Sequence, residues 1–447
     1  MLPGMGTGGR SEPGPRPEAG GVEVAADALE EGDRPISGGA LAPLRIPLFR
    51  RVFAGAFISN VGSWMQNVVL GAIAYDLTDS AVFVGVLLFA QLGPMLLFSM
   101  VGGLLADLVD RRRLLIGVAI TQGLLSLGLA AAIRPDEPSK GLLVLLVFLI
   151  GVGQSIYGPT YSALLPVLVG RHNLKGAIAL NSAQMNGSRV IGPAIGSALL
   201  SRFGGELVFS LNAATYLVVI GALLSVELPA PPGDPSGEQG LRRLLSGLRV
   251  AREDRVIGRC LSVIFLYSLL SLPFIGQLPT LADRNLGIES TSPQYGYLYA
   301  LFGLGALTGA LSIGTWLKDW DLERVARQGL LAFAGALAVF GVLRSPGPAY
   351  LVVLVVGFFY FAVITSLSTV LQQQVDDANR GRVMALWMMG FGGTVPVGNL
   401  IAGPLIEWTS VTTVVLFGAA TAVWLAWYAD VRREPSRRRA DRTLTSA

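Results

Sequence analysis

Twelve apolar stretches, each about 20 residues or longer, constrain most strongly what this chain can fold into. A run of that length, folded as a helix, crosses the roughly 30 Å hydrocarbon core of a bilayer. Charged residues make up only 14% of the chain, against about 25% in an average soluble domain. So little charge disfavours a soluble enzyme, a nucleic-acid binder and a disordered regulator. The sequence therefore predicts an all-α membrane protein with spans at 52–75, 82–106, 114–133, 141–166, 175–201, 206–227, 258–281, 294–317, 325–343, 348–374, 382–408 and 411–430.

Polar segments divide these spans into two sets of six. Residues 1–43 are rich in Gly, Pro, Glu and Ala, and we expect a disordered cytosolic tail. Residues 44–227 and 258–430 are expected to form two six-helix halves. The loop between them, 228–257, is Pro/Gly-rich and then basic and amphipathic, which favours a long cytosolic loop whose second part lies along the membrane surface. Residues 431–447 are predicted to form a basic cytosolic tail.

The placement of basic residues predicts the orientation of the spans. The chain has 34 Lys and Arg residues and a net charge of +4. Most of them fall in the two tails, the central loop and alternate short loops. Because cytoplasmic loops carry the excess of Lys and Arg, both termini are expected in the cytoplasm. The exceptions are Arg189 inside a span and five residues of the outer loops: Arg134, Lys140, Arg202, Arg284 and Arg344.

A weak internal repeat supports two related halves. The segment from Asn173 to Leu180 leads into the fifth span, and the similar segment from Asn379 to Leu386 leads into the eleventh. At the same offset, Gly192 of the fifth span corresponds to Gly398 of the eleventh. Internal repeats of this kind are typical of secondary transporters.

The sequence lacks the motifs of several kinds of functional site. A single cysteine, Cys260, and a single histidine, His172, exclude a disulfide framework and a His-rich metal site. No phosphate-binding Gly-x-x-x-x-Gly-Lys loop and no nucleophile–base arrangement is recognisable. We therefore expect no cofactor, no metal, no enzymatic activity and no nucleic-acid partner.

The most specific local motif lies between the second and third spans. It reads Gly102-Gly103-Leu-Leu-Ala-Asp107-Leu-Val-Asp110-Arg111-Arg112-Arg113. A carboxylate–arginine cluster here could latch helices in one transport state, so Gly103, Asp107, Asp110, Arg111 and Arg112 are predicted gating residues. The alternative is an ordinary basic loop. The Gly-x-x-x-Asp-x-x-Asp-Arg-Arg spacing resembles the signature loop of the major facilitator superfamily.

Further segments narrow the resemblance. They are Ser59–Gln66, Gly158–Pro166, Asn181–Gly196 and Arg380–Leu386. Together they are similar to the branch of this superfamily that contains enterobactin exporters and macrolide-efflux proteins. This resemblance implies a major facilitator fold, efflux of an amphipathic small molecule such as a siderophore or drug, and proton antiport.

The fifth span contains Gly192-Pro193-x-x-Gly196, a pattern that loosens a helix and lets another approach it closely. It resembles the glycine–proline motif of superfamily antiporters, and the resemblance implies a conformational role for Gly192, Pro193 and Gly196. Ordinary tight packing at a helix crossing is the alternative.

Arg189 is the only basic residue well inside a span, so we expect it to face the bundle interior. It could attract an anionic substrate or balance charge in a gate, or it could form a structural ion pair, for example with Asp107. Uncharged polar and aromatic residues suggest an amphipathic central cavity, although hydrogen bonding between helices would explain each one singly. The predicted cavity residues are Asn60, Ser63, Trp64, Asn67, Gln91, Gln154, Tyr157, Arg189, Phe274, Gln277, Tyr299 and Asn399.

These observations favour a monomeric secondary transporter of the cell membrane that exports an amphipathic small molecule by alternating access, and the resemblance implies a bacterial source. Its expected partners are the substrate, a coupling ion, taken to be the proton, and the lipid bilayer. The alternatives are a transport-inactive scaffold or sensor of the same fold and an importer of a small metabolite. A membrane-embedded enzyme is disfavoured because titratable groups do not cluster at one membrane face.

Overall fold

The computed structural model describes residues 39–96, 98, 102, 105, 108–135, 137–225 and 248–429, and these are almost entirely helical. Residues 1–38 of the N-terminal tail, most of the central loop and the C-terminal tail therefore lie outside the described residues, whereas residues 39–43, expected to be disordered, form part of a 3-10 helix. The first helices are η1 (Gly39–Arg45), α2 (Pro47–Asp76), α3 (Ala81–Leu92), α5 (Arg111–Ala132) and α6 (Lys140–Leu224). After the central loop come α8 (Arg255–Leu266), η2 (Tyr267–Ser271), α9 (Pro273–Gly276), α10 (Leu278–Leu286), α11 (Pro293–Gly314), α12 (Leu322–Val342), α13 (Pro346–Gln374), α14 (Asp377–Met388), η3 (Met389–Gly393), α15 (Thr394–Trp408) and α16 (Val411–Tyr428).

Nine helices of the described part are long and apolar enough to cross a membrane, and the segment Ala81–Leu96 is a shorter apolar helix. An all-α membrane fold is thereby confirmed, whereas the number twelve stays a prediction. The 30-residue helix α2 is not among the nine. Polar residues such as Asn60, Gln66 and Asn67 lower its mean hydropathy. They are tolerated because one side of this helix packs against α6.

Two glycines divide the long helix α6. Gly170 and Gly204 have φ angles of 68° and 79°, which side-chain-bearing residues rarely adopt. The loops expected at 167–174 and 202–205 are thus reduced to sharp breaks at single glycines. The resulting segments correspond to the expected fourth, fifth and sixth spans, with the fifth running from His172 to Gly204.

Two other expected spans are broken by wide helical turns. The span expected at 258–281 consists of α8, the π-helical turn η2, α9 and α10; Pro273 is the first residue of α9 and Pro279 the second of α10. The span expected at 382–408 consists of α14, the π-helical turn η3 and α15. Turns of this kind are frequent where a helix has a functional role.

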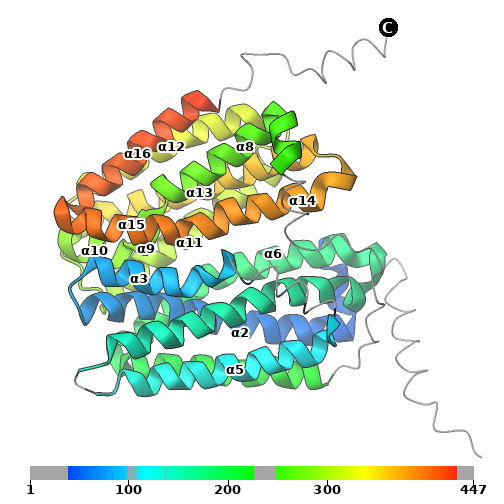
Figure 1. Cartoon of the computed structure of the whole chain (residues 1–447), viewed down its shortest axis with the longest axis horizontal. Helices are drawn as coiled ribbons and strands as arrows, with labels where there is room; N and C mark the ends of the chain where they lie inside the picture. The colour runs from blue at the N-terminus through cyan, green and yellow to red at the C-terminus, as the bar shows by residue number, and fades with distance from the viewer. Residues whose placement is uncertain are drawn as a thin grey trace, which may run out of the picture.

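The helices run roughly parallel along the long axis of the molecule and form two groups (Figure 1). The N-terminal helices (α2 to α6) make up one group and the C-terminal helices (α8 to α16) the other. Helix α10 lies at one end of the molecule, called here the α10 end, and α14 lies towards the opposite end.

Small residues bring the two groups into close contact. A Cβ atom added at Gly403 of α15 would lie 2.8 Å from the carbonyl oxygen of Ala81 in α3. A Cβ atom at Gly303 of α11 would lie 2.9 Å from the carbonyl oxygen of Arg189 in α6. The helix pairs α3–α15 and α6–α11 therefore form the boundary between the groups, as expected where helices pack through small residues.

The two glycines paired by the internal repeat occupy corresponding places. Gly192 packs against Trp64 and Val61 of α2, the first span, and Gly398 packs against Leu269 and Pro273 of the seventh. In each group the fifth helix thus approaches the first through a glycine.

Candidate functional site

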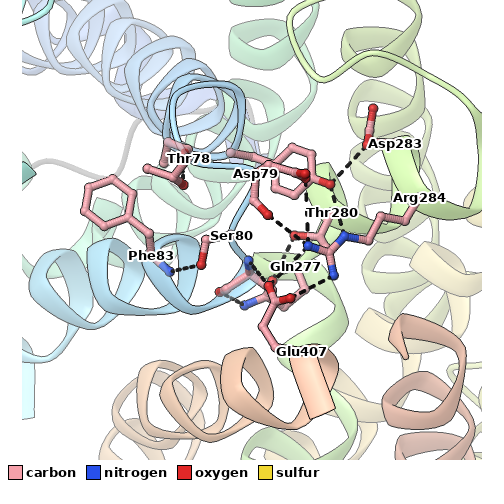
Figure 2. Close-up of polar contacts among 12 residues, drawn as sticks. Thr78, Asp79, Ser80, Phe83, Gln277, Thr280, Asp283, Arg284 and Glu407 are labelled. Atoms are coloured by element: carbon pink, nitrogen blue, oxygen red, sulfur yellow. Dashed lines mark hydrogen bonds and ion pairs between the residues drawn. The ribbon is translucent and has the colours of Figure 1, made fainter. Parts of the chain in front are cut away.

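The first part of the candidate site is a hydrogen-bonded cluster at the α10 end, which we call the latch. It comprises Tyr75, Asp79 and Ala81 of the N-terminal helices and Gln277, Asp283, Arg284 and Glu407 of the C-terminal helices (Figure 2). Arg284 is its centre, because its two terminal nitrogens each donate to a carboxylate oxygen of Glu407 at 3.2 Å. Such bidentate arginine–carboxylate pairs are among the stronger hydrogen bonds in proteins.

Several bonds of the latch join the two groups of helices. Arg284 donates to the carbonyl oxygen of Asp79 at 2.9 Å and to the hydroxyl of Tyr75 at 3.2 Å. Tyr75 in turn donates to Asp283 at 3.0 Å. The backbone N–H of Ala81 donates to Glu407 at 2.8 Å.

Two buried side chains extend this contact inward. Gln277 donates to the carbonyl oxygen of Ala81 at 3.1 Å, and Ser290 donates to that of Ala72 at 3.2 Å. Together with the four bonds made by Arg284, Tyr75 and the backbone N–H of Ala81, six hydrogen bonds between described residues thus join the two groups at the α10 end.

Local sequence places the latch residues. Asp79 has a φ angle of 46° in the tight turn after α2, and Ser80 then caps α3 by accepting from the N–H of Phe83 (Figure 2). Arg284 lies in the last turn of α10, which ends at Gly287 in the left-handed conformation. These short connections hold the polar groups close to the helix boundary.

Two ionisable side chains at the α10 end, Arg284 and Asp76, have raised pKa values. Burial lowers the pKa of Arg284, but its bonds to Glu407 and Tyr75 outweigh this, and the net pKa is raised. Asp76 lies just beyond the expected span 52–75. Its pKa is raised by burial and by repulsion from Glu289 and Asp283. The charged form of Asp76 is therefore disfavoured at the α10 end.

The second part of the candidate site surrounds Arg189 on α6. The guanidinium carbon lies 5.2 Å from the ring centre of Trp64 on α2 and 4.9 Å from that of Phe361 on α13. Both are cation–π distances. The Arg189 Nε is shielded from solvent and has no hydrogen-bond partner. Tyr299, also predicted for the cavity, joins the neighbouring aromatic cluster through Phe302, with ring centres 6.2 Å apart.

Other predicted cavity residues bind one another. Gln91 donates to Asn67, and the hydroxyls of Ser63 and Tyr216 lie 3.2 Å apart. Asn60 and Tyr157 are half-buried, and Gln154 is exposed. These contacts lie within the N-terminal helices, so the polar stripe of α2 serves helix packing at several of its positions.

Three predicted cavity residues of the C-terminal helices are fully buried. Phe274 packs edge-on against Phe302, and Gln277 belongs to the latch. Asn399 donates to the carbonyl oxygen of Val395, while its own side-chain oxygen is buried without a partner. In this conformation these side chains lie in packed interfaces.

The predicted gating residues of the signature loop divide into two sets. Gly103 and Asp107 lie outside the described residues. Asp110 caps α5 by accepting from the N–H of Arg113 at 2.8 Å. Arg111 donates to the carbonyl oxygen of Ala163, and Arg112 donates to the last carbonyl oxygens of α6. These bonds fasten α5 to α6 within the N-terminal helices.

The glycine–proline motif lies at the contact between α6 and α2. A Cβ atom at Gly192 would lie 2.5 Å from the Cβ of Trp64, and one at Gly196 would lie 3.0 Å from the Cα of Met65. Pro193 is buried inside α6, beside Gly296 of α11. The motif therefore holds Trp64 in place beside Arg189.

Sequence reasoning missed the latch. The sequence pattern places Arg284 in an outer loop, and nothing in it links this residue to Glu407, 123 positions further along the chain. A usable signal was present, because Arg284 is one of few basic residues in the outer loops and therefore stands out. Within the described residues, no group of three or more His, Cys, Asp or Glu side chains is placed to hold a metal ion.

Two long groups of helices, joined by a latch at one end and enclosing an arginine near mid-length, define a membrane transporter of the major facilitator type. The profile of the transmembrane secretion effector family matches residues 38–441, and the chain belongs to that family. It is 32% identical over 349 residues to the enterobactin exporter EntS of Escherichia coli O139:H28 (strain E24377A / ETEC) and to that of Escherichia fergusonii. The match covers 76% of this chain and 81% of each relative.

Solved structures with similar folds are also transporters. The nucleoside transporter NupG has a TM-score of 0.64 at 15% identity, covering 87% of this chain and all of that one. A bacterial homologue of the human lysosomal transporter Spinster, in an inward-facing and unoccupied conformation, has a TM-score of 0.64 at 16% identity, covering 86% and 95%. At such identities the likeness concerns the fold alone. The chain is thus a multi-pass membrane protein with a transporter fold.

Proposed function

We propose that this protein exports an amphipathic small molecule, siderophore-like or drug-like, by alternating access in antiport with protons. The observation that carries the proposal is the latch, which joins the two groups of helices at the α10 end. A rocking transporter needs such a contact in one state and must break it in the other. The name of the relatives, enterobactin exporters, supports the direction and the substrate class.

The α10 end is proposed to face outward and both termini inward. The reason is that the expected outer loops carry few basic residues, whereas Arg111, Arg112 and Arg113 form the first turn of α5 at the opposite end. The present conformation is then closed to the outside and would receive substrate from the cytoplasm. Gating by the signature loop, including Asp107, belongs to the same proposal.

An accumulation assay tests this function. Cells with and without the protein are loaded with enterobactin or with a panel of amphipathic dyes, and efflux is followed with and without a protonophore. We expect faster efflux in cells that make the protein, and loss of the difference when the protonophore is added. Equal efflux in both strains would refute transport, and higher accumulation in the expressing strain would favour the importer.

A further inference from the structure

Arg189 is a cation whose counter-charge is missing from its described surroundings. It lies near the middle of the α6 segment His172–Gly204, where a charged side chain is costly unless it faces the interior. The residue is half-buried, and its Nε is shielded from solvent with no hydrogen-bond partner. No carboxylate among the described residues pairs with it.

Aromatic rings form the walls around this cation. The guanidinium lies between Trp64 and Phe361, at 5.2 and 4.9 Å from their ring centres. The ring centre of Tyr360 lies 4.8 Å from that of Phe361, and the ring centre of Phe302 lies 5.5 Å from that of Tyr360. Ring faces attract a cation through their quadrupoles, but they neutralise no charge and accept few hydrogen bonds. The guanidinium therefore keeps unused donor capacity.

We propose that Arg189, Trp64 and Phe361 form the recognition site for an organic anion with a flat aromatic body. This inference rests on the proposed export function, because it names the substrate class of the same transporter. A guanidinium presents paired donors that match a carboxylate. The flanking rings suit an aromatic body by stacking, and the positive charge repels cationic compounds of the same shape. The site thus selects by charge among amphipathic molecules.

The two aromatic side chains that contact Arg189 come from different groups of helices. Trp64 belongs to α2 of the N-terminal helices and Phe361 to α13 of the C-terminal helices. When the groups rock against each other, Arg189 cannot keep both ring contacts unchanged. A bound anion supplies the missing counter-charge during that change, so binding and rocking are coupled through the same side chain.

The competing role is a purely structural one, in which Arg189 clamps the two groups through its ring contacts. A structural clamp has no preference among charged ligands. Three ligands of nearly equal shape separate the roles: 1-naphthoate is anionic, 1-naphthamide is neutral and 1-naphthylmethylammonium is cationic.

The experiment measures binding of these three compounds to the purified full-length protein by titration calorimetry. We expect 1-naphthoate to bind about tenfold or more tightly than 1-naphthamide, with the ammonium compound weakest. Arg189→Gln should remove this preference, and Arg189→Lys should retain part of it. The matched control is Arg202→Gln, the same exchange at an exposed position of α6, which should bind like the wild type.

Equal affinities for the three compounds would overturn the inference, and so would a wild-type protein that does not bind 1-naphthoate. A preference that survives in Arg189→Gln would also overturn it. If cells still export neutral or cationic dyes in those cases, the proposed function stands while the anion site fails. Selective binding of 1-naphthoate without export of any compound would instead refute the proposed function and leave the site.

Discussion

Removal of the Arg284 side chain should shift the protein towards the state that is open at the α10 end. Arg284→Gln deletes two bonds that join the groups of helices, to the Asp79 carbonyl oxygen and the Tyr75 hydroxyl, and also the pair with Glu407. About a third of each charged side chain is exposed (30% for Arg284 and 34% for Glu407), which weakens the bonds. At about 1 kcal/mol for each joining bond, the shift is roughly 2 kcal/mol, or about 30-fold in the equilibrium.

A thiol reporter measures this shift. Ser290 is buried behind the latch, and its hydroxyl bonds to the Ala72 carbonyl oxygen across the boundary, so Ser290→Cys is a small change that stays hidden in the closed state. The native Cys260 is buried and is first replaced by serine. The labelling rate of Cys at position 290 with a hydrophilic maleimide should then rise about 30-fold in the Arg284→Gln background.

The matched control is Arg344→Gln. Arg344 binds the carbonyl oxygens of Gly341 and Leu343 and the hydroxyl of Thr412, all within the C-terminal helices. Its loss should therefore leave the labelling rate unchanged. The reasoning about the latch is refuted if Arg284→Gln labels no faster than the parent, or if both arginine variants accelerate labelling equally.

Three further predictions concern stability in detergent, measured by thermal unfolding. Gly192→Ala should cost about 1–3 kcal/mol, because the added methyl group meets the Cβ of Trp64, whereas Gly221→Ala has open space and serves as its control. Arg112→Gln should cost about 1–2 kcal/mol by uncapping α6, and an unchanged unfolding temperature would remove its structural role. The pKa of Asp76 is raised, which means that the folded state favours the protonated carboxyl group. The stability that this protonated form contributes is lost as pH rises through the raised pKa. Asp76→Asn should thus stabilise the protein at pH 7.5 but not at about pH 3, below the ordinary pKa of an aspartate, and a pH-independent difference would contradict this.

Much of the fold follows from one-dimensional patterns. Long apolar runs indicate membrane helices because the bilayer sets their minimum length. The expected spans at 348–374 and 411–430 accordingly agree within two residues with α13 and α16. The loops expected around 167–174 and 202–205 were wrong in length, since a single glycine with positive φ suffices to break α6. The wide turns η2 and η3 also escaped prediction, because they depend on packing between helices.

For the site, the sequence by itself identified Arg189 as the unusual residue, because a charge inside an apolar run is costly wherever the helix packs. It also identified the small residues of the glycine–proline motif. Only the tertiary structure decided that Trp64 and Phe361 enclose Arg189 and that Tyr75, Arg284 and Glu407 meet in one latch. The physical reason is that composition and spacing report the cost of placing a group in a membrane. Partners far apart in the chain are chosen by how the helices pack.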